Sequence, residues 1–227
     1  MAAGRSRISL GRAIEVIPAG GGPTLGGVEE IASAYTAVAD RYVDRFGRAA
    51  SVHPNDLDLI EKYLTLESEP VLDAGCGPGH LAAHLSSRGV NSIGVDITSA
   101  FIDHARRTAA LERLAVGSLC HLPLRDGSVS GLLVWYSLIH LHPGDVASAL
   151  TESRRVAAGG AVVVTAFFDG EVVEEFAHKV APAYTWPIDQ FSALMIDAGF
   201  SEIDRAQRPG DPSIGVRAHA ALVAVAQ

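Results

Sequence analysis

Short, continuous apolar runs alternate with helical segments along most of the chain, and this alternation constrains the fold more than any other feature. The runs read PVLDAG, NSIGVDI, LAVGS, SGLLVWYS and GGAVVVTAFF. Strands that are apolar on both faces are typical of a parallel sheet covered by helices on both sides. The chain is therefore predicted to form a three-layer α/β sandwich with one mostly parallel sheet.

The ends of the chain differ from this pattern. FSEIDRAQR and VRAHAALVAVA are joined by PGDPSIG without a helix, which permits an antiparallel pair. Apolar residues at helical spacing predict one helix from Val28 to near Gly47 and a second from Pro54 to Leu64. The glycine-rich residues 1–26 are expected to form a flexible leader, and residues 27–227 a single domain.

Charge and cysteine content exclude several classes of function. The 227 residues carry a formal net charge of −8 with no run of like charges, which argues against a nucleic-acid partner. Cys76 and Cys120 are too few for a disulfide framework and lack metal-ligand spacing, so we expect reduced thiols, a cytoplasmic protein and no metal site. No apolar window of about 18 residues predicts a membrane span. A monomer or homodimer is expected.

A glycine-rich stretch, DAGCGPG, joins the first predicted strand to its helix. Gly75, Gly77 and Gly79 remove side chains where the turn is tight and where a ligand must touch the main chain. The helix that follows presents its N-terminal amide groups to the same point. Ligands of open parallel sheets bind at this edge, so the loop is predicted to hold a cofactor.

Acidic residues around the loop indicate which cofactor. A dinucleotide-binding loop needs glycine where this chain has His80, and Asp73 would repel a pyrophosphate but suits a cation. Asp96 ends the second strand, where a carboxylate can accept both hydroxyls of a ribose. A nucleoside without phosphate and with a cationic amino-acid tail describes S-adenosylmethionine. A structural alternative for Asp96 is that it caps the following helix.

The sequence resembles the class I S-adenosylmethionine-dependent methyltransferases, most of all the small bacterial enzymes that act on free metabolites. VLDAGCGPGH, GVDIT, LCHLPLRDGSVSGLLVWYSLIHL, AAGGAVVV and LMIDAGF occur in the family's order, between Tyr35 and Ala226. The resemblance implies a Rossmann-like fold with seven strands in the order 3-2-1-4-5-7-6, strand 7 being antiparallel. It also implies S-adenosylmethionine as cofactor, a small-molecule methyl acceptor, and N-terminal lid helices at about 28–66.

The resemblance carries over to particular cofactor contacts. Ser118 stands where the family usually has an acid or amide at the adenine amino group, so this contact departs from the pattern. A tyrosine of the lid helix, Tyr35, is expected near the cofactor. The full expected set is Asp73, Gly75, Gly77 and Gly79 at the methionine end, Trp135 beside it, Asp96 at the ribose, Ile97, Ser118 and Leu119 at the adenine, and Tyr35 above.

Candidates for catalysis and acceptor binding follow from the same positions. His140, after the fourth strand, is the candidate general base or substrate-orienting group, and the alternative is a histidine that braces the loop. Tyr42 and Ser137 are expected near the acceptor. Aromatic residues after the fifth strand predict a pocket lining, or alternatively ordinary packing: Phe167, His178, Tyr184 and Trp186.

Two other functions remain open from the sequence. One is a protein that binds S-adenosylmethionine without catalysis. The other is a nicotinamide-dependent oxidoreductase, against which His80 and Asp73 both count.

Overall fold

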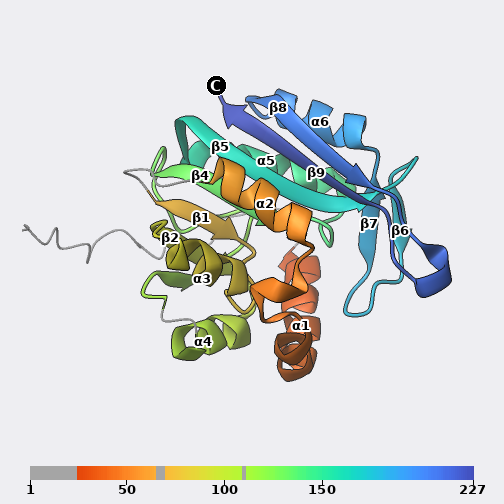
Figure 1. Cartoon of the computed structure of the whole chain (residues 1–227), viewed down its shortest axis with the longest axis horizontal. Coiled ribbons are helices and arrows are strands. Elements are labelled where there is room, and N and C mark those ends of the chain that lie inside the picture. Colours follow the sequence, from red (N-terminus) through yellow and green to blue (C-terminus); the bar gives the residue numbers. More distant parts are fainter. Residues whose placement is uncertain (1–24, 65–69, 109–110) are drawn as a thin grey trace, which may run out of the picture.

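A mostly parallel sheet runs through the middle of the computed structural model, which describes residues 25–64, 70–108 and 111–227 (Figure 1). Five parallel strands lie in the order β3 (Leu114–Val116), β2 (Ser92–Asp96), β1 (Val71–Ala74), β4 (Val129–Trp135) and β5 (Ala157–Asp169). Each of these coincides with one of the apolar runs of the sequence. Because β1 lies in the centre, the glycine loop that follows it opens at the middle of the sheet edge.

Two long strands complete the sheet beyond β5. β9 (His219–Ala226) pairs antiparallel with β5, and β8 (Phe200–Arg208) pairs antiparallel with β9. This arrangement confirms the expected order 3-2-1-4-5-7-6 with its antiparallel last strand.

Within the described residues the sheet has nine strands rather than the seven expected, because a short hairpin adds to it. β6 (Glu174–Phe176) pairs antiparallel with β7 (Ala183–Trp186), and β7 runs parallel to the end of β5. β4 ends with Trp135 opposite Ala166, so the last residues of β5 have a free edge that β7 occupies. Part of the segment after the fifth strand, for which a pocket lining was predicted, therefore forms this hairpin.

Helices cover both faces of the sheet. They are α1 (Leu25–Phe46), α2 (Pro54–Tyr63), α3 (His80–Ser87), α4 (Ser99–Thr108), α5 (Pro143–Val156) and α6 (Ile188–Asp197), with short 3-10 turns at Ala49–Ser51 and Pro212–Ile214. α1 begins at Leu25, so residues 25 and 26, expected in the leader, belong to the helix instead. The rest of the leader, residues 1–24, and residues 65–66 of the expected lid lie outside the described residues.

Alternate residues of each strand supply two cores. On one face, Leu133 of β4 and Val164 of β5 pack with α2 and α3. On the other face, their neighbours Leu132 and Val163 pack with α5 and α6. Figure 1 shows α2 and α5 on opposite sides of the strands. Burial on both faces is the reason the strands read as continuous apolar runs.

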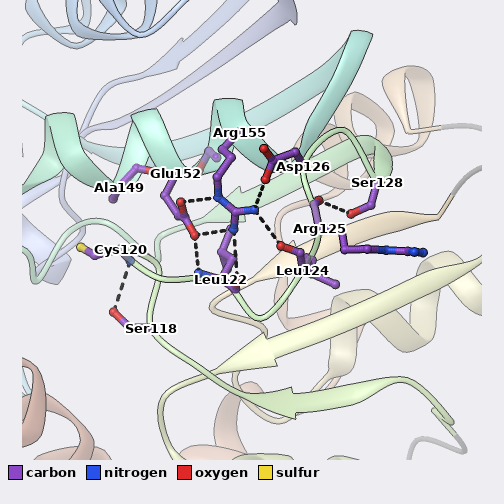
Figure 2. A network of polar contacts seen from close by, with 11 residues as sticks. Ser118, Cys120, Leu122, Leu124, Arg125, Asp126, Ser128, Ala149, Glu152 and Arg155 are labelled. Atoms are coloured by element: carbon purple, nitrogen blue, oxygen red, sulfur yellow. Dashed lines mark hydrogen bonds and ion pairs between the residues drawn. The ribbon is translucent and has the colours of Figure 1, made fainter. Parts of the chain in front are cut away.

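The loop between β3 and β4 is held in place by an ionic network on α5 (Figure 2). Arg155 donates to the carbonyl oxygens of Leu122 and Leu124 at 3.1 and 2.8 Å, and to the carboxylate of Asp126 at 2.7 Å. Glu152 accepts from Arg155 and from the backbone N–H of Leu122, the latter at 2.7 Å. The network fixes the course of the loop that begins at residues 117–119.

In the parts of the chain that the structure describes, no helix has the length and apolar character needed to cross a membrane.

Replacing Arg155 with methionine should lower the free energy of unfolding by about 1–3 kcal/mol, because Glu152 and two loop carbonyls lose a charged donor. Urea denaturation measures the loss. Arg88→Met is the matched control, since it removes an exposed ion pair with Glu61 and should cost less than about 1 kcal/mol. Equal losses in the two variants would contradict the anchoring role of Arg155.

Candidate cofactor and substrate site

A cavity of about 610 Å³ opens at the carboxyl ends of β1, β2 and β4. Its wall comes from α1, the start of α2, the glycine loop, the ends of β2 and β4, the turn of the β6–β7 hairpin and the residues on either side of the β8–β9 connection. The volume is within the range of small-molecule and cofactor sites. The position is the edge at which parallel sheets of this kind bind ligands.

The glycine loop is shaped by two close approaches. Gly75 has a φ of +78°, and a Cβ built on it would lie 2.3 Å from the Cβ of Ser137. The N–H groups of Gly75 and Cys76 both donate to the carbonyl oxygen of Val95, which ties the loop to β2. Gly77 has a φ of +52° and lines the cavity, and a Cβ on it would meet no atom within 4 Å. The loop therefore leaves open space over its main chain, as a bound ligand would need.

Gly79 corrects one prediction, because it does not line the cavity. It precedes α3 with a φ of +80°, and a Cβ there would lie 2.9 Å from the Cβ of Ala105 on α4. Its lack of a side chain serves the packing of α3 against α4 rather than the ligand.

Asp96 joins the glycine loop to the end of β2. Its Oδ2 accepts from the N–H of Gly77 at 2.8 Å, and its Oδ1 accepts from the N–H of Thr98 at 2.7 Å, just before α4. The residue is 8 % exposed and lines the cavity. These bonds hold the glycine loop and the turn before α4, which begins at Ser99, so Asp96 ties the loop in place without capping the helix itself. Its carboxylate can still accept from a ligand.

Asp73 is a buried carboxylate at the base of the cavity. It is 2 % exposed, and its Oδ2 accepts from the N–H of Ala82 in the first turn of α3 at 3.0 Å. Burial raises the pKa of Asp73 to about 7, and the nearby charge of Asp96 adds to the rise. None of the ion pairs among the described residues includes Asp73, so its environment suits a cationic ligand group.

The expected adenine contacts lie together on the cavity wall. Ile97, Ser118 and Leu119 all line it. The hydroxyl oxygen of Ser118 accepts from the N–H of Cys120 at 3.2 Å, so its proton remains available to a ligand.

Aromatic side chains of α1 close one side of the cavity. Tyr35 and Tyr42 pack edge to face with ring centroids 5.4 Å apart, and both contact Phe101 of α4. Burial and the charge of Asp96 raise the pKa of Tyr42 to about 12, and the pKa of Tyr35 is raised as well. Both tyrosines therefore lie at the end of the cavity that contains Asp96.

His140 lines the cavity with both ring nitrogens engaged. Its Nδ1 is 2.7 Å from the carbonyl oxygen of Pro182, so this nitrogen carries the proton and donates. Its Nε2 then accepts from the hydroxyl of Tyr35 at 2.7 Å. Burial lowers the pKa of His140. These bonds correspond to the alternative given by the sequence, a histidine that braces its loop.

The end of β4 supplies Trp135 and Ser137, which both line the cavity. The hydroxyl oxygen of Ser137 is buried and has no hydrogen-bond partner among the described residues. A buried polar atom beside the glycine loop is consistent with a ligand that completes its hydrogen bonding.

Three of the four predicted pocket aromatics lie elsewhere, and only His178 lines the cavity. The ring of Phe167 stacks on that of Phe191 with centroids 4.2 Å apart, and the ring of Trp186 packs edge to face on Phe191 with centroids 5.6 Å apart. Phe167 and Trp186 therefore belong to the core under α6. Tyr184 donates to Glu175 on the hairpin. The prediction for Phe167 is wrong by one strand position, because the next residue, Phe168, faces the cavity.

A cluster that the sequence did not predict completes the wall: Asp56, Tyr136, Arg208 and His219. Arg208 donates to both carboxylate oxygens of Asp56, at 2.8 and 3.0 Å. His219 and Tyr136 join through a 2.6 Å hydrogen bond. Asp56 and Arg208 are separated by 152 positions in the chain, and no motif links them. We call these four residues the Asp56 cluster.

Comparison with known proteins identifies the class of this domain. Residues 71–160 match the family model described as a methyltransferase domain. Malonyl-[acyl-carrier protein] O-methyltransferase from Salmonella typhimurium is 32 % identical over 138 residues, which are 57 % of this chain and 54 % of that protein. Ubiquinone biosynthesis O-methyltransferase from Coxiella burnetii is 33 % identical over 95 residues, 40 % of each chain. The chain thus spans about half or less of the length of these curated relatives.

Solved structures share the fold over more of the chain. The 1,6-didemethyltoxoflavin-N1-methyltransferase of Burkholderia thailandensis has a TM-score of 0.74 at 19 % identity and covers 98 % of both chains. The [4+2]-cyclase SpnF has a TM-score of 0.72 at 14 % identity and covers 90 % of this chain and 97 % of its own. The strand order and the site define the class I methyltransferase fold.

Residues 71–160 thus match a methyltransferase domain, and the chain shares its fold with S-adenosylmethionine-dependent methyltransferases. This confirms the resemblance predicted from the motifs, and with it S-adenosylmethionine as the cofactor of the domain class.

Asp73 should make stability fall as pH rises. Its pKa is about 7 in the folded protein against 3.8 ordinarily, so between these values the folded state holds the proton more tightly. Its contribution to the free energy of unfolding should therefore drop by about 2 kcal/mol between pH 5 and pH 7. Urea denaturation at both pH values should show this drop in the wild type relative to Asp73→Asn. Asp103→Asn, which changes an exposed carboxylate, should behave like the wild type.

Proposed function

We propose that this protein transfers a methyl group from S-adenosylmethionine to a small-molecule acceptor. The observation that carries the proposal is the meeting of Asp73, Asp96 and the open main chain of Gly77 in one cavity. Asp73 would bind the cationic group of the cofactor, Asp96 would bind its pair of ribose hydroxyls, and Gly77 would let the cofactor approach the main chain closely.

The cofactor would extend along the glycine loop. Asp73 would hold its amino group, and Asp96 would accept from the ribose hydroxyls through its remaining acceptor capacity. Ile97 and Leu119 would enclose the adenine, with Ser118 as a hydrogen-bonding group. Trp135 would lie beside the methionine portion, and Tyr35 would cover the ribose from α1.

The cofactor supplies a methyl group on a sulfonium, which is a good leaving group. What the protein has to do is align the acceptor with that methyl group and keep water away. The aromatic side chains of α1 and Phe101 provide a cover of this kind. His140 would act as a positioning residue, since its two bonds join Tyr35 of the cover to the hairpin at Pro182.

The acceptor would occupy the other part of the cavity, where Ser137, Phe168 and His178 are candidate contacts, whereas Tyr42, expected near the acceptor, lies at the Asp96 end. The cavity is closed to a volume that suits a small molecule rather than a nucleic acid. Both curated relatives described above are named as O-methyltransferases, which favours an oxygen acceptor.

Binding of S-adenosylhomocysteine, measured by isothermal titration calorimetry, tests the cofactor site. The wild type should bind, and Asp96→Asn should weaken binding by about 1–3 kcal/mol, because a charged acceptor for the ribose hydroxyls is lost. Asp103→Asn, on the exposed face of α4, is the control that should leave the affinity unchanged. No binding by the wild type would exclude the proposed function, and an unaffected Asp96→Asn variant would exclude the ribose contact.

Catalysis is tested by methyl transfer from labelled S-adenosylmethionine to a panel of phenols, alcohols, carboxylic acids and amines. Transfer to at least one class is the expected result. Retained binding with no transfer to any member would instead indicate a non-catalytic S-adenosylmethionine-binding protein, a role open to this fold since fold alone does not fix chemistry.

A further inference from the structure

The Asp56 cluster joins four elements at one end of the cavity. Asp56 comes from α2, Arg208 from the end of β8, His219 from the start of β9, and Tyr136 from the residue after β4. Asp56 is 6 % exposed and His219 is 3 % exposed, although both line the cavity. Burying a charged group costs free energy, and for Asp56 the two hydrogen bonds from Arg208 offset that cost.

Tyr136 is held in an unusual backbone conformation. Its φ of 55° is the one positive value of a non-glycine residue in the described ranges. Its N–H donates to the carbonyl oxygen of Ala166 at 3.0 Å, and its ring packs on Phe168 with centroids 4.9 Å apart. Backbone strain of this kind persists at sites where it aims a side chain for a function.

The geometry sets the direction of the hydrogen bonds. Nε2 of His219 lies 3.5 Å from Oδ1 of Asp56 and makes no hydrogen bond to any described residue, but the nearby carboxylate favours a proton on this nitrogen. Nδ1 then carries the lone pair and accepts from the hydroxyl of Tyr136 at 2.6 Å. The hydroxyl oxygen of Tyr136 keeps acceptor capacity for a ligand in the cavity.

The charges around His219 leave it neutral but able to accept a proton. Burial lowers the pKa of His219, Asp56 and Asp169 oppose this, and Arg208 and His53 add to it. Burial also raises the pKa of Tyr136, which disfavours the ionised form of the tyrosine. Asp56 is itself held in place by the two bonds from Arg208.

The second tyrosine–histidine pair, Tyr35 with His140, lacks these properties. The nitrogen of His140 that faces away from Tyr35 meets a backbone carbonyl, which cannot balance a positive imidazolium as a carboxylate does. Tyr35 also lies near Asp96, at the ribose end of the cavity. The charge that acts on Tyr136 is that of Asp56 instead, so the two tyrosine–histidine pairs lie in different parts of the cavity.

We propose that Tyr136, His219 and Asp56 form a proton relay that accepts the proton of a hydroxyl acceptor. This inference rests on the proposed methyl transfer. As the acceptor oxygen bonds to the methyl carbon, the carbon–sulfur bond breaks and its electron pair stays on sulfur. The acceptor proton passes to the Tyr136 oxygen, and the tyrosine's own proton passes to Nδ1 of His219. Asp56 stabilises the imidazolium of His219 until His219 releases the proton to water.

The relay specifies a class of acceptor. Phenols and alcohols are protonated at neutral pH and require a group that removes the proton. Carboxylates arrive ionised and would gain nothing from Tyr136. The structure therefore favours phenols and alcohols among the possible oxygen acceptors.

The first test needs no acceptor. The ring of Trp135 lies 5.7 Å from His219, and the only other tryptophan is Trp186, so Trp135 fluorescence can be followed in a Trp186→Phe background. Protonated histidine quenches a neighbouring indole, so emission should fall as His219 is protonated. His219→Gln should abolish this transition, and Asp56→Asn should move its midpoint to lower pH. A midpoint unchanged by Asp56→Asn, or a transition that survives His219→Gln, would overturn the relay.

The second test measures turnover with a phenol or alcohol from the acceptor panel. Tyr136→Phe should lower kcat by about 100-fold or more at pH 7, the usual size of a lost general-base contribution, while affinity for S-adenosylhomocysteine stays within about twofold. The loss should shrink at high pH, where the acceptor ionises unaided. Tyr63→Phe is the matched control, because it removes a 2.6 Å hydroxyl bond to Asp204 outside this cavity.

The outcomes separate this inference from the proposed function. If the wild type methylates a hydroxyl acceptor and Tyr136→Phe does so at the same rate, the relay is overturned and the proposed function stands. Turnover confined to carboxylic acids or amines would also overturn it. Absence of S-adenosylhomocysteine binding would overturn the proposed function and the relay's role in it, and the fluorescence transition would then show only whether the three groups are coupled.

Discussion

The close approach of Gly75 to Ser137 is the contact on which the rest of the site depends. A single added methyl group at position 75 would lie 2.3 Å from the Cβ of Ser137. Because there is none, the loop after β1 and the end of β4 form one continuous wall. Asp73, Asp96 and Tyr136 consequently line the same cavity.

Sequence periodicity predicted the parts of the fold that follow from burial on two faces. The five parallel strands and the antiparallel final pair are confirmed as the pattern predicted them, and their order is confirmed as the family resemblance implied it. The β6–β7 hairpin could not be predicted, because its strands have only three and four residues and the hairpin pairs only with the part of β5 that extends beyond the end of β4. Phe167 shows a related limit: a run apolar on both faces does not reveal which residue faces the cavity.

Some residues of the candidate site could likewise be predicted from the sequence, and others could not. Asp73, Asp96 and the glycines lie at strand ends within one local motif, so their convergence can be read from the chain, although Gly79 proved to be a packing residue. Asp56 and Arg208 meet through pairing between α2 and β8, which no local pattern encodes. Buried long-range ion pairs of this kind are visible only once the sheet is assembled.

The wall of the cavity comes from two parts of the chain. The stretch that matches the methyltransferase model, residues 71–160, contains the glycine loop, Asp96 and the expected adenine contacts. Much of the opposite wall comes from outside it: Asp56 before, and Phe168, His178, Arg208 and His219 after. Under the proposed function, such a chain would change its methyl acceptor through substitutions in the flanks, while the part that matches the methyltransferase model would keep the cofactor contacts.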